Sequence, residues 1–135
     1  MCNFNINNMK KQNINRVGFI FNLDKHYDEG SHWVALYIII DSNNSHYGAY
    51  YYDSTANKPT PEIKSFIEKL NESLQKHKLI LKYNTIKHQL GTTECGMFVI
   101  YFLEQMLNNI SFTKFINNKK LNDKYVFKMR NKYFN

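Results

Sequence analysis

The chain has 135 residues, 43% of them hydrophobic and 16% aromatic, and a formal net charge of +7, which fits one folded domain and excludes a disordered chain. Its longest apolar runs, VALYIII and MFVIYFL, stop at seven residues, far below the ~20 that cross a bilayer, so we expect no membrane part. The widely separated Cys2 and Cys95 and a start, MCNF, without signal-peptide character exclude a disulfide scaffold and predict a reducing, intracellular compartment.

The first half of the chain predicts strands. Residues 1–15 are polar and predict a flexible segment, and a single domain is expected over residues 16–135. RVGFIFNL (16–23) and HWVALYIIID (32–41) are rich in aromatic and β-branched residues, and the second is apolar on both faces, as in a central strand. YGAYYYD (47–53) follows as its hairpin partner across the polar turn SNNSH.

The second half predicts a further strand, LILKYNT (79–85), and two main helices. Thr60 as N-cap and Pro61 in the first turn begin a helix that is apolar along one side. A second helix, about Cys95 to Leu107, is apolar nearly all round and is therefore expected to be buried. Residues 112–135 predict a basic helix or tail. The fold class is α+β, a mixed or antiparallel central sheet flanked by helices.

Cys95 stands at the N-terminal end of this core helix. Unpaired amides and the positive end of the helix dipole lower a thiol pKa there, which favours the nucleophilic thiolate. Gly96 would let a substrate approach the backbone closely, and the amides of this turn could stabilise an oxyanion. The alternative is that Cys95 is a small buried hydrophobic residue, the commoner role of a lone intracellular cysteine.

A thiolate nucleophile needs an imidazole partner, and His32 at the start of the central strand is the best placed of five histidines. In an antiparallel hairpin Asp53 returns near His32 and could orient its imidazole. A loop over 42–46 would put Asp53 opposite Ala35, so a bulge or twist would have to absorb a three-residue offset. The alternatives are a strand-end histidine bonded to a loop and an aspartate in a turn.

Gln89 lies six positions before Cys95 and could donate its side-chain amide to an oxyanion, a role for which His88 and Asn84 are alternatives. Cysteines and histidines do not occur at zinc-ligand spacing, and the five glycines are scattered, so neither a metal site nor a phosphate loop is predicted. We expect no cofactor.

The ordered set HW, YYDS and Q-x5-CG, within GSHWVALYI, AYYYDST and HQLGTTECGMFVIYF, resembles the ubiquitin-like-specific and adenovirus-type cysteine protease superfamily. The resemblance spans approximately Val17 to Leu107. It implies a papain-like fold with the catalytic order His, Asp, Cys. It also implies Cys95 as nucleophile, His32 as base and then acid, Asp53 as its orienting residue, and Gln89 as oxyanion donor.

The resemblance also bears on the substrate. SUMO-removing members usually carry Asp before the nucleophile and enclose a diglycine between two tryptophans, whereas this chain has Glu94 and only Trp33. TECGMF and NLDKHYDEGSHW look more like the polyprotein-processing proteases of large DNA viruses. Trp33 is expected to cover the substrate cleft, so that only small substrate residues, of the Gly-Gly or Gly-X type, can enter. The alternative is that the Trp33 side chain packs in the core.

The leading prediction is therefore a thiol protease maturing viral polyproteins, acting on a protein substrate as a monomer in host cytoplasm, nucleus or virion. The alternatives are a deconjugating isopeptidase for SUMO or another ubiquitin-like modifier, an acetyltransferase of the same fold, and a non-enzymatic nucleic-acid-binding domain. The basic tail could contact nucleic acid weakly, and some adenovirus-type relatives use DNA as an activator. Relatives of the superfamily often carry a larger N-terminal lobe that helps to hold the substrate, whereas only about fifteen residues precede the first strand here. We therefore expect either a minimal catalytic unit or a partner that supplies this part of the substrate site.

Overall fold

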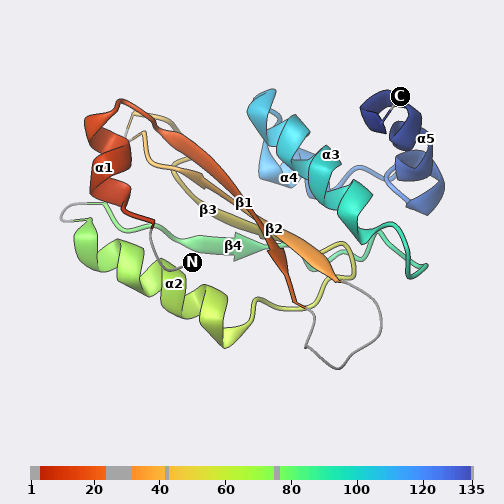
Figure 1. Ribbon diagram of the computed structural model, residues 1–135, viewed down its shortest axis with the longest axis horizontal. Helices are drawn as coiled ribbons and strands as arrows, with labels where there is room; N and C mark the ends of the chain where they lie inside the picture. Colours follow the sequence, from red (N-terminus) through yellow and green to blue (C-terminus); the bar gives the residue numbers. More distant parts are fainter. Residues whose placement is uncertain (1–3, 24–31, 42, 75–76, 135) are drawn as a thin grey trace.

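The computed structural model describes residues 4–23, 32–41, 43–74 and 77–134. The elements follow one another along the chain as shown in Figure 1: α1 (Ile6–Lys11), β1 (Arg16–Asn22), β2 (Trp33–Ile39), β3 (Gly48–Tyr52), α2 (Pro61–Ser73), β4 (Leu81–Tyr83), α3 (Cys95–Leu107), α4 (Phe112–Ile116) and α5 (Asp123–Phe134). In the described part of the chain, every helix is too short or too polar to cross a membrane.

The four strands form one mixed sheet in the order β1-β2-β3-β4. The pairs β1–β2 and β2–β3 are antiparallel, whereas β4 lies parallel to β3. A parallel neighbour needs a crossover connection, and α2 provides it between β3 and β4. The predicted α+β class and the order of the predicted strands are confirmed.

Side chains of β2 alternate between two hydrophobic clusters, one on each face of the sheet. Ala35, Tyr37 and Ile39 pack with α3, α4 and α5, while Val34, Leu36 and Ile38 pack with α1 and α2. Figure 1 shows the same division, with α1 and α2 on one side of the sheet and the later helices on the other. Because β2 is buried on both faces, its sequence is apolar throughout, as predicted.

The two main helices begin where their sequences predicted. The Thr60 side chain accepts a hydrogen bond from the Ile63 amide at 3.3 Å, and Pro61 occupies the first helical position of α2. In α3, Phe98 and Phe102 are fully buried, since this helix packs along β2 and β3 and is covered by α4 and α5.

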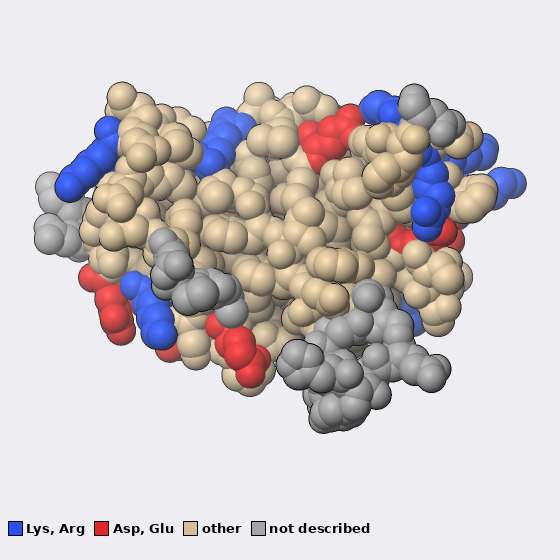
Figure 2. Space-filling model, in the orientation of Figure 1, with Lys and Arg blue, Asp and Glu red and all other residues tan. Residues whose placement is uncertain are grey.

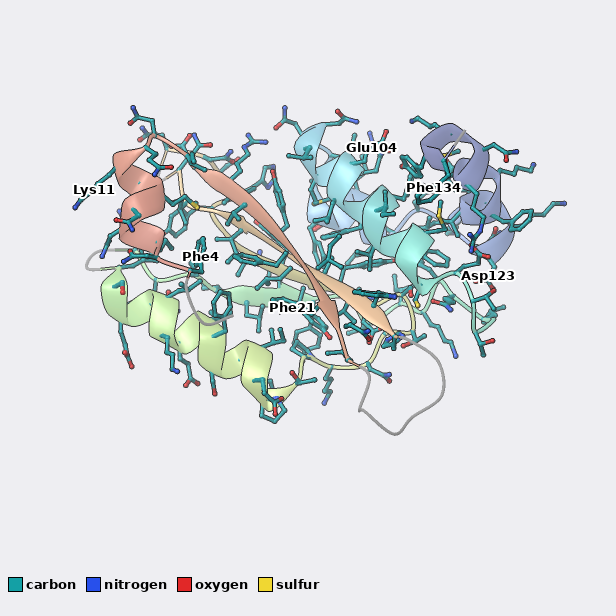
Figure 3. All side chains as sticks on the ribbon, in the orientation of Figure 1. Phe4, Lys11, Phe21, Glu104, Asp123 and Phe134 are labelled. Carbon is teal, nitrogen blue, oxygen red and sulfur yellow. The ribbon has the colours of Figure 1, made fainter. Side chains whose placement is uncertain are left out.

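The structure differs from the prediction at α1, which lies within the segment expected to be flexible. Asn5 caps this helix by accepting hydrogen bonds from the Asn7 and Asn8 amides at 2.9 and 3.2 Å. Ile6 and Met9, three positions apart, bury their side chains in the cluster around α2. Phe4, labelled in Figure 3, packs against the same cluster. Its ring lies edge-on to that of Phe19, with centroids 5.0 Å apart. Because most residues of this segment are polar, its composition did not predict a helix held to the core by a few apolar side chains.

The core of α3 gives a prediction for stability. Phe102 stacks on Tyr52 with ring centroids 4.8 Å apart, so Phe102→Ala should lower the free energy of unfolding by about 3–5 kcal/mol in urea titrations. The matched control is Leu107→Ala on the same helix, where the side chain is 63% exposed and the expected change is below about 0.5 kcal/mol. Equal losses in the two variants would contradict the burial described here.

Candidate active site

Cys95 is the first residue of α3, and its side chain is buried. The preceding residue, Glu94, makes no side-chain hydrogen bond that caps the helix. Its sulfur is hydrogen-bonded to the side chain of His32 and to the backbone of Trp33 and Gly96, contacts that lower the pKa of the thiol. The helix terminus and the start of β2 therefore converge on one sulfur atom.

His32 and Asp53 lie just beyond the paired ends of β2 and β3, and His32 Nε2 is 2.9 Å from Asp53 Oδ1. The register pairs Ala35 with Tyr52, which places Asp53 opposite Val34 and two residues from His32. Diagonal neighbours of this kind are within reach of long side chains. The predicted proximity is found, but the predicted register was wrong by one residue, and no bulge is needed.

The surroundings of Asp53 hold its carboxylate in one orientation. Its Oδ1 accepts hydrogen bonds from the Thr55 amide at 2.8 Å and the Thr55 hydroxyl at 2.7 Å, so Asp53 also forms the predicted turn. The Asn84 side chain pairs with both backbone groups of Asp53, at 3.0 and 2.6 Å. Burial raises the pKa of Asp53, but hydrogen bonds from His32 and Thr55 outweigh it, so the pKa is lowered overall. Asp53 is therefore ionised at neutral pH.

The same contacts fix the protonation of the other two groups. The hydrogen bond to Asp53, followed by that to Cys95, raises the pKa of His32 to about 10, against the opposing effect of burial. Burial raises the pKa of the Cys95 thiol, yet the contacts with His32 and the two backbone amides lower it overall. Since Nε2 of His32 faces Asp53, Nδ1 is the nitrogen left for the sulfur. The site favours a thiolate beside an imidazolium.

Gln89 is buried and held at both ends of its side-chain amide. Its Oε1 accepts a hydrogen bond from the Ser54 hydroxyl at 2.6 Å, and its Nε2 donates to the Gly91 carbonyl at 2.9 Å. An amide nitrogen carries two hydrogens, so one remains for an oxyanion.

The two alternatives to Gln89 have structural partners. His88 lies 2.8 Å from the Tyr52 hydroxyl through Nδ1 and 2.9 Å from the Ile116 carbonyl through Nε2. Asn84 is bound to the backbone of Asp53, as described above. Both side chains support the chain around Asp53, which leaves Gln89 as the better candidate for oxyanion contact.

An open cleft of about 450 Å³ adjoins the sulfur. Its lining comprises Trp33, Thr92, Thr93, Cys95, Gly96, Met97, Ile100, Arg130 and Phe134. Trp33 is 36% exposed, so its side chain is not packed in the core, which was the alternative expected from the sequence. A Cβ atom on Gly96 would lie 3.8 Å from Trp33 Cδ1, in ordinary van der Waals contact, so the glycine and the indole are neighbours in the lining of the cleft.

Sequence reasoning brought together His32, Asp53, Cys95, Gln89, Trp33 and Gly96, and the structure places all six at this end of the sheet. It missed Arg130 and Phe134, because these were assigned to a basic tail. It also missed the support from Thr55 and Asn84. The Asp-Ser-Thr sequence indicates a turn in which Thr55 bonds to Asp53, whereas no local sequence pattern indicates that Asn84 contacts Asp53. In the described ranges, no three His, Cys, Asp or Glu side chains are grouped to hold a metal ion.

Comparisons with known proteins show the family to which the chain belongs. Residues 5–135 match the model of the Ulp1 protease family, C-terminal catalytic domain. The chain therefore belongs to the Ulp1 protease family, and the resemblance predicted from its motifs is confirmed.

Similar proteins come from large DNA viruses. The putative thiol protease R355 of Acanthamoeba polyphaga mimivirus is 33% identical over 99% of this chain and 44% of its own length. The cysteine protease S273R of African swine fever virus (isolate Tick/Malawi/Lil 20-1/1983) is 29% identical over 92% of this chain and 45% of its length. The chain thus spans less than half the length of these curated relatives.

Solved structures extend the likeness to the fold. The pS273R protease of African swine fever virus superposes with a TM-score of 0.75 and 28% identity, over 86% of this chain and 43% of that chain. The SUMO protease Ulp1 superposes with a TM-score of 0.54 and 18% identity, over 80% and 53%, a likeness of fold alone.

The coupled titration of Cys95 and His32 predicts how the thiol reacts. Alkylation of Cys95 by iodoacetamide, followed on its own peptide by mass spectrometry, should rise with an apparent pKa below the ordinary ~8.5 of a thiol. In His32→Ala the apparent pKa should move upward, because burial remains while the stabilising contact is lost.

The control for this measurement is His46→Ala, a histidine outside the cleft, which should leave the titration unchanged. A thiol that titrates near ~8.5 in the unaltered protein, or that ignores the loss of His32, would contradict the ion pair.

Proposed function

We propose that this chain is a cysteine peptidase that hydrolyses peptide bonds through a thioester intermediate. The observation that carries the proposal is the sequence of contacts from the buried Asp53 carboxylate to the His32 imidazole and on to the Cys95 sulfur, at the mouth of a cleft. This is the arrangement of an orienting acid, a base and a nucleophile.

In the proposed mechanism the Cys95 thiolate attacks the scissile carbonyl carbon, and the carbonyl oxygen takes the negative charge. The imidazolium of His32 gives its proton to the departing amine as the C–N bond breaks, leaving an acyl thioester on the sulfur. Neutral His32 then takes a proton from water, which attacks the thioester carbon; the C–S bond breaks, the acid is released, and the thiolate and imidazolium are restored. Asp53 orients the ring throughout and stabilises its charged form.

The proposed oxyanion site combines the remaining hydrogen of Gln89 Nε2 with the backbone amide of Cys95. Gln89→Ala should lower kcat by about 10²–10³-fold, because a donor aimed at developing charge is lost. The KM for a peptide substrate should change little. Ser54→Ala is the companion variant: it removes the 2.6 Å hydrogen bond that holds Gln89 Oε1, and a smaller loss is expected. Unchanged kcat in Gln89→Ala would exclude this role.

The position of Trp33 over Gly96 supports a substrate with small residues at the cleavage site, of the Gly-Gly or Gly-X type. A bulky side chain entering beneath the indole would meet both the ring and the helix start. The relatives are thiol or cysteine proteases of viruses, and the proposed substrate class is therefore a viral polyprotein. A relative from African swine fever virus is named a SUMO-1 cysteine protease, which favours deconjugation of a ubiquitin-like modifier as the second candidate.

Other expectations are part of the proposal. The thiol nucleophile must stay reduced to react, and a reducing environment inside a cell or virion would keep it so. Activation by DNA and weak nucleic-acid contact through residues 112–135 stay predictions based on charge, and so does the monomeric state. An acetyltransferase activity stays the less favoured alternative, because it rests on fold resemblance alone.

Cys95→Ser tests the proposed function. Incubation with a mixed peptide library should yield cuts after small residues in the unaltered protein, and the variant should lose more than about a thousandfold in kcat/KM because serine is not ionised. Circular dichroism and thermal unfolding should stay the same. Undiminished cleavage by the variant would exclude the mechanism. Labelling of Cys95 by a SUMO or ubiquitin C-terminal vinyl probe would favour the deconjugation candidate.

A further inference from the structure

We propose that α5 is a positioning element for the proposed peptidase, whose residues Asp123 and Arg130 hold the segment between Gln89 and Cys95, here called loop 89–94. The inference rests on the proposed function. It assigns a role to a C-terminal helix that the sequence marked only as basic. Figure 3 labels Asp123 at the end of α5 that faces this loop.

The first contact is made by Asp123 at the start of α5. Its Oδ2 accepts hydrogen bonds from the backbone amides of Leu90 and Gly91, both at 2.9 Å. The carbonyl of the same Gly91 accepts the hydrogen bond from Gln89 Nε2. The peptide units around Gly91 therefore link Asp123 to the side-chain amide of Gln89, so that α5 fixes the direction of the remaining Gln89 hydrogen.

The second contact is made by Arg130, two turns further along α5. Its Nε and Nη2 each donate to one oxygen of the Glu94 carboxylate at 3.2 Å, in a two-point pairing that restrains orientation as well as distance. Glu94 is buried and immediately precedes Cys95. Arg130 also lines the cleft beside the sulfur. The loop is thus held near both of its ends by one rigid helix.

Loop 89–94 has little other support between these two contacts. Leu90 is 80% exposed, and the next three residues are exposed as well. An exposed segment with few packing contacts opens at low free-energy cost unless hydrogen bonds restrain it. The backbone of the proposed oxyanion site should therefore depend on α5 more than on the loop itself.

The helix is anchored by other residues, so the two loop contacts can be removed without releasing it. Val126 is fully buried in the core, and the hydroxyls of Tyr101 and Tyr125 are 3.0 Å apart. Glu104 on α3 pairs with Lys132 at 2.8 Å and also accepts a hydrogen bond from Tyr133. Figure 1 shows α5 lying beside α3.

The test compares Asp123→Ala and Arg130→Ala with the control Lys132→Ala, which breaks an α5–α3 ion pair that includes no residue of the loop. Each loop-contact variant should lose about 10–100-fold in kcat, since misplacement by about 1 Å can cost 10²-fold. The KM should change by less than about threefold. Asp123→Asn, whose carbonyl can still accept from the two amides, should retain more of the kcat than Asp123→Ala. Lys132→Ala should match the unaltered protein.

Two further readouts separate positioning from a merely structural role. Alkylation of Cys95 at neutral pH should proceed unchanged in Asp123→Ala, because the contact with His32 does not involve the loop, whereas general destabilisation would alter it. Hydrogen exchange at the Leu90 and Gly91 amides should be slow in the unaltered protein and fast in this variant.

Retention of kcat within about twofold in both loop-contact variants of an active enzyme would overturn the inference, as would an equal loss in Lys132→Ala. A raised KM with unchanged kcat in Arg130→Ala would also overturn it for this residue, and would assign Arg130 to substrate contact. If the unaltered protein protects the two amides but cleaves nothing, the proposed function fails and the contact of α5 with the loop is supported.

Discussion

The site depends on one buried negative charge, the carboxylate of Asp53. A carboxylate removed from water is costly unless several donors compensate it, and here an imidazole, a hydroxyl and a backbone amide share one oxygen. This compensation keeps His32 protonated, and His32 in turn stabilises the Cys95 thiolate. The sheet register, the Asn84 side chain and the start of α3 all serve to keep these three groups in contact.

Much of this arrangement follows from local sequence signals. Thr60 and Pro61 mark a helix start through capping and a fixed φ, and the apolar stretch after Cys95 can only be a buried helix or strand. His32 and Asp53 stand at the ends of two runs that are joined by a short turn, so antiparallel pairing alone brings them close. The positions of these two residues are predictable because the strands beside them determine where the chain must go.

Other features depend on contacts between distant segments, which leave no local pattern. The backbone amides of residues 90 and 91 donate hydrogen bonds to the carboxylate of residue 123. The polar composition of these two segments predicts only a loop and a tail. The register error of one residue arose because loop length does not fix turn geometry. Trp33 could not be placed from its strand alone, since a tryptophan at the start of a buried strand fits either a core or a cleft.

The dependence of loop 89–94 on α5 has a consequence for synthesis of the protein. A ribosome releases the N-terminal part of a chain first, at roughly 5–20 residues per second. The histidine and aspartate therefore emerge before the cysteine, and the helix that steadies the loop emerges after it. We expect the proposed oxyanion site of a nascent chain to stay disordered until this helix has docked, which would delay the proposed proteolysis until the domain has folded.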